Sequence, residues 1–179
     1  MNKSPKEPGD AFENEVIDFL VRSVGSDLWI HKPEGKLPGD KILGASGLWE
    51  VDIIIEKPLK FIEDEPRTKT GNVRSGTLEH DPLPRAVIEC KWAGPIAAEK
   101  RQKGSSLDSN LARAYEHLND IHLKNQQTKL FVVVSRLPIR GEQSRDYLLL
   151  FRNIGVGFFN FGDPSDRQRL VEEVTTLIP

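Results

Sequence analysis

Residues 85–91, Arg-Ala-Val-Ile-Glu-Cys-Lys, combine an apolar centre with two charged residues that are separated by a single cysteine. Side chains alternate between the two faces of a strand, so Glu89 and Lys91 would project to one face, and Ile88 and Cys90 to the other. The apolar neighbours predict that this strand lies inside a sheet, where unpaired charges are costly. We therefore expect nearby groups that compensate Glu89 and Lys91.

A second segment, residues 48–55, predicts a strand with the same arrangement. Glu50 and Asp52 would share one face, whereas Val51 and Ile53 would occupy the other. If the two strands pair, three carboxylates and one ammonium group converge. Clustered carboxylates resist ionising together, and a divalent cation relieves this repulsion while using them as hard oxygen ligands. The pattern favours Mg²⁺, with Mn²⁺ as a substitute.

The rest of the chain alternates between helical and extended patterns. Apolar residues at helical spacing predict helices over 10–25, 107–121, 147–154 and 164–177. Further strands are predicted at 28–31, 130–135 and 156–161. The continuous apolar run of 130–135 is typical of a central strand buried on both faces. This order predicts an α/β fold in which helices flank both faces of a mixed sheet.

The chain of 179 residues is long enough for one domain with its own core, and we expect a single domain over residues 1–179. The glycine- and proline-rich residues 32–47 predict a loop or hairpin. Residues 56–84 contain four prolines and no sustained period, which predicts a loop insertion, and such insertions are usually functional or disordered.

Composition restricts the class of protein. A net charge of -2 and a pI near 6.1 give no overall basic character, so any contact with nucleic acid must come from local basic patches. No apolar run approaches the length of a membrane span. The polar residues 1–9 lack the apolar segment of a signal peptide, and the single cysteine, Cys90, cannot form an internal disulfide. We expect a cytoplasmic protein without a membrane partner.

The arrangement of Asp52, an apolar tail and later Ile88-Glu89-Cys90-Lys91 resembles the PD-(D/E)XK nuclease superfamily, which has a restriction-endonuclease-like fold. Three further features resemble it: residues 9–13, Gly-Asp-Ala-Phe-Glu, which start a helix; the succession of helix and strand after Lys91; and residues 155–157, Gly-Val-Gly, which enter a strand. The resemblance spans residues 9–161 in organisation, but only these short motifs carry specificity.

The resemblance implies an Mg²⁺-dependent DNA endonuclease, of the restriction or DNA-repair type. It implies that Asp52, Glu89 and the backbone carbonyl of Cys90 hold the metal and that Lys91 is the catalytic lysine. Glu13 would contribute to catalysis from the first helix, although Asp10 and Glu13 equally fit a helix-capping pair.

Three details depart from the family pattern or compete with it. Glu50 occupies a position that is often not acidic, so it is either a secondary metal ligand or a solvated neighbour. Val51 stands where the family usually has proline. Asp40, in Pro38-Gly39-Asp40, lacks a flanking apolar strand, and a turn is its expected role.

Basic residues in two segments, and one flank of the helix at 107–121, could contact DNA, although solvated loops are the default interpretation of the two basic segments. The candidates are Arg67, Lys69, Arg74, Lys100, Arg101, Lys103, Asn110 and Arg113. His117 lies on the same flank and could face substrate, but we expect it at the surface. Because cleavage of both strands of a duplex needs two active sites, we expect a symmetric homodimer.

Several alternatives remain open in the sequence. The same fold could serve a catalytically inactive subunit that binds nucleic acid or supports an assembly. Trp49 and Trp92 could stack on bases, but a role in the core is favoured. Cys90 should pack as a small hydrophobe rather than act as a nucleophile. The scattered histidines make a zinc site improbable.

Overall fold

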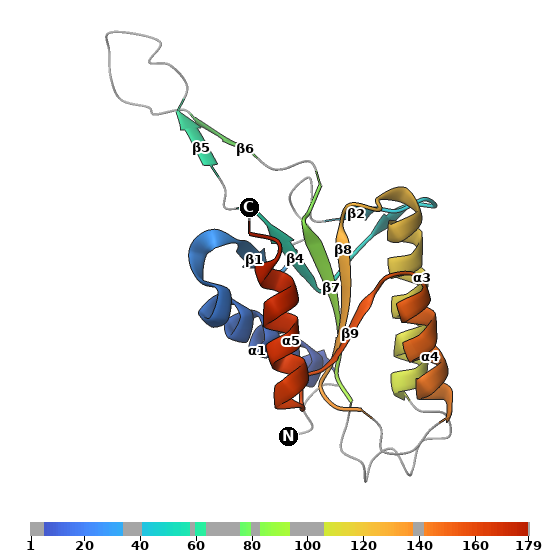
Figure 1. The fold of residues 1–179 in the computed structure, drawn as a ribbon. Coiled ribbons are helices and arrows are strands. Elements are labelled where there is room, and N and C mark those ends of the chain that lie inside the picture. Colours follow the sequence, from blue (N-terminus) through green and yellow to red (C-terminus); the bar gives the residue numbers. More distant parts are fainter. Residues whose placement is uncertain are drawn as a thin grey trace, which may run out of the picture.

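The computed structural model describes residues 6–33, 41–57, 60–63, 76–79, 83–93, 106–137 and 142–178. Its centre is a five-stranded sheet in the order β1-β4-β7-β8-β9 (Figure 1). These strands are β1 (Trp29–His31), β4 (Ile53–Glu56), β7 (Ala86–Lys91), β8 (Lys129–Val134) and β9 (Gly157–Asn160). Strands β1, β4 and β7 pair antiparallel, whereas β7, β8 and β9 pair parallel. The sheet is therefore mixed, as the sequence predicts.

Four helices of the described chain cover the two faces of this sheet (Figure 1). One face packs against α1 (Lys6–Val24) and α5 (Pro164–Thr175), and the other packs against α3 (Ser106–Lys124) and α4 (Glu142–Asn153). A short 3₁₀ turn, η1 (Gly25–Asp27), follows α1. The expectation of an α/β fold with helices on both faces is confirmed.

The interior strands explain why the sheet can be sandwiched in this way. In β7, Ile88 joins the core beneath α1 and α5, whereas Val87 joins the core beneath α3 and α4. In β8, the same alternation holds for Phe131 and Val132. Strand β8 is interior, as expected, but β7 occupies the middle position. The motif strand is thus the most enclosed strand of the sheet.

The strand expected over residues 48–55 is not continuous, which corrects the sequence prediction. It divides into β3 (Leu48–Trp49) and β4, with residues 50–52 between them. Strand β3 pairs with β2 (Ile42–Leu43) in a separate two-stranded sheet, so a hairpin is present, but its second strand lies beyond the expected range of 32–47. The break separates Glu50 from the main sheet.

The insertion expected over residues 56–84 has structure of its own. Glu56 completes β4, and β5 (Lys60–Glu63) pairs antiparallel with β6 (Gly76–Glu79) in a second small sheet (Figure 1). The expectation of a plain loop is therefore wrong for these residues. The four-residue strands are too short to give the sustained alternation on which the sequence prediction depended.

Helix ends agree only partly with their sequence signals. Helix α1 begins at Lys6, before the expected start at Asp10, so the interpretation of Asp10 and Glu13 as a capping pair is wrong. Asp163 does cap α5, because its side chain accepts a hydrogen bond from the Ser165 amide at 2.8 Å. No described helix has the length and apolar character that a membrane crossing requires.

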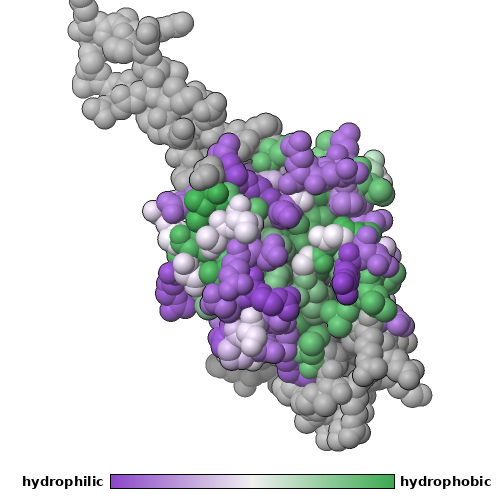
Figure 2. Space-filling view, viewed as in Figure 1, coloured by the Kyte–Doolittle hydropathy of each residue, from purple (hydrophilic) through white to green (hydrophobic). Residues whose placement is uncertain are grey.

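Strand β9 forms one edge of the main sheet, and the surface between α5 and α4, where this strand runs, is largely apolar (Figure 2). Two side chains of α5 bond to its backbone. Asp166 accepts from the Asn160 amide at 2.8 Å, and Arg169 donates to the Phe158 carbonyl at 3.3 Å. These contacts occupy groups that would otherwise invite pairing with another strand.

A pair of glycine substitutions tests the helix boundaries. Gly155 follows α4 with φ of 72°, where an added Cβ is strained, so Gly155→Ala should lower the free energy of unfolding by ~1–2 kcal/mol. Gly9 lies within α1 with open space where a Cβ would stand, so Gly9→Ala should raise it by ~0.5–1 kcal/mol. Urea unfolding measures both. Effects of the same sign would contradict the helix assignments.

Candidate active site

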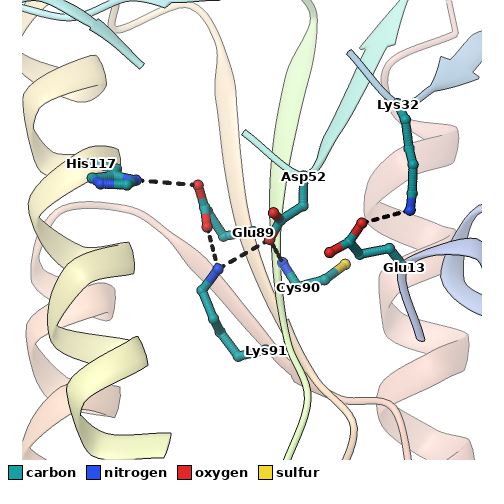
Figure 3. A network of polar contacts seen from close by, with 7 residues as sticks. All are labelled: Glu13, Lys32, Asp52, Glu89, Cys90, Lys91 and His117. Atoms are coloured by element: carbon teal, nitrogen blue, oxygen red, sulfur yellow. Dashed lines mark hydrogen bonds and ion pairs between the residues drawn. The ribbon is translucent and has the colours of Figure 1, made fainter. Parts of the chain in front are cut away.

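Three charged side chains meet where β4 begins and β7 ends (Figure 3). The Lys91 ammonium lies 3.0 Å from Oδ2 of Asp52 and also forms an ion pair with Oε2 of Glu89. Asp52 directly precedes β4, and Ile53 pairs with Ile88 of β7. The convergence expected for Asp52, Glu89 and Lys91 is therefore present in the structure.

Asp52 also contacts the backbone of the motif strand. Its Oδ2 accepts a hydrogen bond from the Cys90 amide at 2.7 Å. A backbone carbonyl of a neighbouring strand would normally accept from this amide, so the carboxylate takes over a sheet bond where the β4–β7 pairing stops. Since the N–H and C=O of one strand residue point to the same edge, the Cys90 carbonyl also faces the Asp52 side.

Glu89 lies on the face of the sheet that α3 covers, and only 3% of its side chain is exposed. Its Oε1 is buried and has no hydrogen-bond partner among the described residues. This oxygen faces Nδ1 of His117 on α3 at 3.6 Å, a distance too long for a hydrogen bond. A buried carboxylate oxygen in this state can accept an incoming ligand.

The pKa values of the two carboxyl groups shift in opposite directions. Burial and the nearby Glu89 raise the pKa of Asp52 to about 6, against the opposing effects of Lys91 and the Cys90 amide. Burial also acts to raise the pKa of Glu89, but His117 and Lys91 outweigh it, so this pKa is lowered. Near neutral pH the two groups therefore form a cluster in which Glu89 holds its charge more readily than Asp52.

Lys91 remains an ammonium group in this environment. Burial alone would lower the pKa of Lys91, but Glu89 and Asp52 together raise it above its ordinary value. A lysine held in this way cannot act as a proton acceptor near neutral pH. It can instead stabilise negative charge that develops beside it.

Cys90 behaves as the sequence predicts. Its side chain packs in the core beneath α1 and α5, away from Glu89 and Lys91. Burial raises the pKa of the thiol well above its ordinary value, and Asp52 adds to this effect. A thiol that resists ionisation is a poor nucleophile.

The donor set at this site suits a hard divalent cation. No group of three histidine, cysteine, aspartate or glutamate side chains in the described part of the chain is arranged to hold a metal. The site instead offers two carboxylates and a backbone carbonyl, and Oε1 of Glu89 accepts no hydrogen bond within the described chain. Mg²⁺ is usually bound through one or two carboxylates, with water and substrate phosphate completing its octahedron. The residues present fit this requirement.

His117 belongs to the site, which corrects the expectation that it lies at the surface. Only 19% of its side chain is exposed, and its ring stacks on Trp49 with centroids 4.3 Å apart. The Trp49 indole donates to Asp120 at 2.6 Å, which lowers the pKa of Asp120 together with the Ser46 amide. Trp49 is thus a partly buried support for His117. The sequence signal for this role was the position of His117 on the same helix flank as Asn110 and Arg113.

Two other carboxylates remain apart from the cluster. Glu50 is 74% exposed at its side chain and pairs with Lys41 at 3.0 Å, so it does not converge with Asp52 and Glu89 as expected. Glu13 pairs with Lys32 at 2.7 Å, and Figure 3 shows both on the far side of Cys90 from Glu89. Within the described chain, Glu13 makes no direct contact with the three clustered residues.

The expected DNA-contacting residues are only partly placed. On α3, Asn110 is half-buried and Arg113 is exposed. Trp92 is 38% exposed, so its expected role in the core is wrong. The remaining candidates, together with the turn expected at Asp40, lie outside the described residues; these candidates are Arg67, Lys69, Arg74, Lys100, Arg101 and Lys103.

Comparison with protein-family models, curated proteins and solved structures finds no match to this chain. The geometry of the site therefore carries the functional argument.

The raised pKa of Asp52 predicts a stability effect in protein kept free of metal by a chelator. A carboxyl whose pKa rises from 3.8 to about 6 on folding stabilises the fold below pH 3.8, and this contribution is lost as pH rises through about 6. The neutral Asp52→Asn variant retains it. We expect the variant to be more stable than wild type by ~1–3 kcal/mol at neutral to alkaline pH, and by less near pH 4.5.

Urea unfolding at both pH values measures this difference. Glu50→Gln serves as the control, because Glu50 is an exposed carboxylate outside the cluster, and it should change stability little at either pH. An Asp52→Asn variant that is less stable than wild type above pH 7 would contradict the assigned electrostatics.

Proposed function

We propose that this chain is an Mg²⁺-dependent DNA endonuclease of the PD-(D/E)XK type with a restriction-endonuclease-like fold. The observation that carries the proposal is the convergence of Asp52, Glu89 and Lys91 at one end of two adjacent strands, with a buried Glu89 oxygen that accepts no hydrogen bond in the described chain and meets only His117, at 3.6 Å. Restriction and DNA-repair enzymes are the two types that this proposal includes.

The fold supports the proposal through the way it positions these groups. The acidic residue before β4 and the Glu-Cys-Lys segment of β7 come from adjacent antiparallel strands. Strand β7 then pairs with β8 in parallel, and helices enclose both faces. Since β7 is the middle strand, its two functional side chains are held on a rigid support, which is what precise positioning of a reacting group requires.

Asp52, Glu89 and the carbonyl of Cys90 would hold the Mg²⁺, and Mn²⁺ could replace it. When bound, the ion supplies a Lewis acid that polarises a phosphoryl oxygen and lowers the pKa of a coordinated water. The low pKa of Glu89 keeps this carboxylate ionised and ready to bind a cation. The carboxyl group of Asp52 would lose its proton more readily once such a cation lies beside it.

Lys91 would stabilise the negative charge that builds up on the phosphate as its ester bond is attacked. Its ammonium is fixed by two carboxylates, so little reorganisation is needed when the charge develops. The raised pKa of Lys91 argues that it acts as a charged donor and positions water, rather than removing a proton from it.

His117 would help to position Glu89 from the α3 side. Its ring is fixed by stacking on Trp49, and its Nδ1 lies 3.6 Å from Oε1 of Glu89. Arg113 is exposed on the same helix and could meet the phosphate backbone. A symmetric homodimer would supply the second active site that cleavage of duplex DNA needs.

The proposal predicts that wild-type protein nicks or linearises supercoiled plasmid in the presence of Mg²⁺. Asp52→Asn removes a metal ligand, and Lys91→Ala removes the stabilising charge, so each should slow cleavage by at least ~100-fold. Glu50→Gln is the matched acidic control and should cleave at the wild-type rate, because Glu50 lies outside the cluster. Agarose gels that follow plasmid conversion over time measure the rates.

Two results would overturn the proposal. Equal cleavage by wild type, Asp52→Asn and Lys91→Ala would place the activity in another site or in a contaminant. Absence of cleavage on every form of DNA and RNA would favour a catalytically inactive subunit that binds nucleic acid or supports an assembly.

A further inference from the structure

A cavity of about 490 Å³ lies on the opposite face of the sheet from Glu89 and Lys91. Its lining residues follow the carboxyl ends of β7, β8 and β9 or belong to the first half of α1 and the start of α5. Its volume falls within the range of pockets that hold small organic ligands, about 300–1,000 Å³. None of Asp52, Glu89 and Lys91 lines it, so it is separate from the candidate active site.

The cavity is nevertheless joined to the catalytic strand through the backbone. Trp92, one of its walls, directly follows Lys91. Ser135, another wall, donates its amide to the Lys91 carbonyl at 3.1 Å and accepts from the Ala93 amide through its hydroxyl at 2.8 Å. The wall of the cavity is therefore continuous with the end of β7 that carries Lys91.

Aromatic and guanidinium groups form part of its walls. Trp92 is 38% exposed, although most tryptophan side chains are well buried. Phe161 packs edge to face against Phe12 at 5.7 Å, and the Arg167 guanidinium lies 5.6 Å from the Phe161 ring. Tryptophan rings and guanidinium planes are the surfaces on which proteins stack bases that have left a nucleic-acid helix.

One positive and one negative side chain on the walls fit an uncharged ligand that has a polar edge. Arg167 and Glu15 both line the cavity, and within the described chain neither forms an ion pair. A site for a free anion would carry an excess of positive charge. One donor group and one acceptor group instead match the edge of a nucleobase, which presents both acceptors and donors.

We propose that this cavity binds one unstacked nucleobase of the substrate strand, with Trp92 and Arg167 as its stacking surfaces and Glu15 at its polar edge. This inference rests on the proposed function, because it takes nucleic acid as the substrate. It adds a site for a base on the opposite face of the sheet from Lys91. A base bound there would keep the substrate strand aligned with Lys91.

Binding of single-stranded oligonucleotides tests the inference without any cleavage. Fluorescence anisotropy in excess chelator compares a labelled ten-residue oligothymidylate with an oligomer of the same length made of abasic deoxyribose phosphates. Both carry the same phosphates, so only bases distinguish them. Wild type should bind the base-bearing strand more tightly by about 5- to 150-fold, the range that stacking of a base on an aromatic side chain gives.

Variants assign this preference to the cavity. Trp92→Ala and Arg167→Ala should reduce the preference for bases, whereas Trp92→Phe should retain most of it because it keeps an aromatic ring. Arg152→Ala on α4 is the matched control for Arg167, since it removes an exposed arginine far from the cavity lining, and it should leave the preference unchanged. Circular dichroism checks that each variant is folded. If Trp92→Ala does not fold, the comparison of Arg167→Ala with wild type and Trp92→Phe still tests the site.

The outcomes separate this inference from the proposed function. A base preference that survives in folded Trp92→Ala and Arg167→Ala, or wild type that binds both oligomers equally, would overturn the base site even if plasmid is cleaved. A preference lost in these two variants alone would support the base site even if wild type cleaves nothing.

Discussion

The structure depends on one shared cation, the Lys91 ammonium between the carboxylates of Asp52 and Glu89. Burial raises the pKa of Asp52, and repulsion by the nearby carboxylate of Glu89 raises it further. Lys91 relieves part of it, but Oε1 of Glu89 still has no hydrogen-bond partner in the described chain. A divalent cation would complete this compensation. A structural ion pair would need only one carboxylate, and this surplus of acidic groups supports the proposal of a metal site.

The backbone around the cluster shows how the fold makes room for it. Pairing of β4 with β7 stops where the Asp52 side chain accepts the Cys90 amide in place of a carbonyl. Because a side-chain carboxylate here accepts the hydrogen bond in place of a backbone carbonyl, it lies in the plane of the sheet beside the Glu-Cys-Lys segment. Behind that segment, Cys90 packs into the core, and Trp92 forms a wall of the cavity on the opposite face. The end of β7 thus contributes to the charged cluster on one face of the sheet and adjoins the cavity on the other.

Much of this arrangement could be predicted from strand periodicity alone. Alternation in β7 placed Glu89 and Lys91 on one face and Cys90 on the other, since an enclosed strand leaves no freedom to rotate. The same rule failed for Glu50, because the chain leaves the extended conformation between β3 and β4 and period two no longer applies. The role of His117 could not be predicted, because its contact with Glu89 depends on how α3 packs across the sheet. Local patterns specify faces, whereas contacts between elements need the packed structure.

The central claim is that Asp52 and Glu89 form a site for a divalent metal. The most direct test titrates chelator-treated protein with Mn²⁺ and follows free Mn²⁺ by its electron paramagnetic resonance signal. Wild type should remove Mn²⁺ from solution in a saturable way, Mg²⁺ should compete, and folded Glu89→Gln should bind at least ~10-fold more weakly because it loses a charged ligand. Glu50→Gln should match wild type. Mn²⁺ binding that is unchanged in Glu89→Gln, or absent from wild type, would contradict the account.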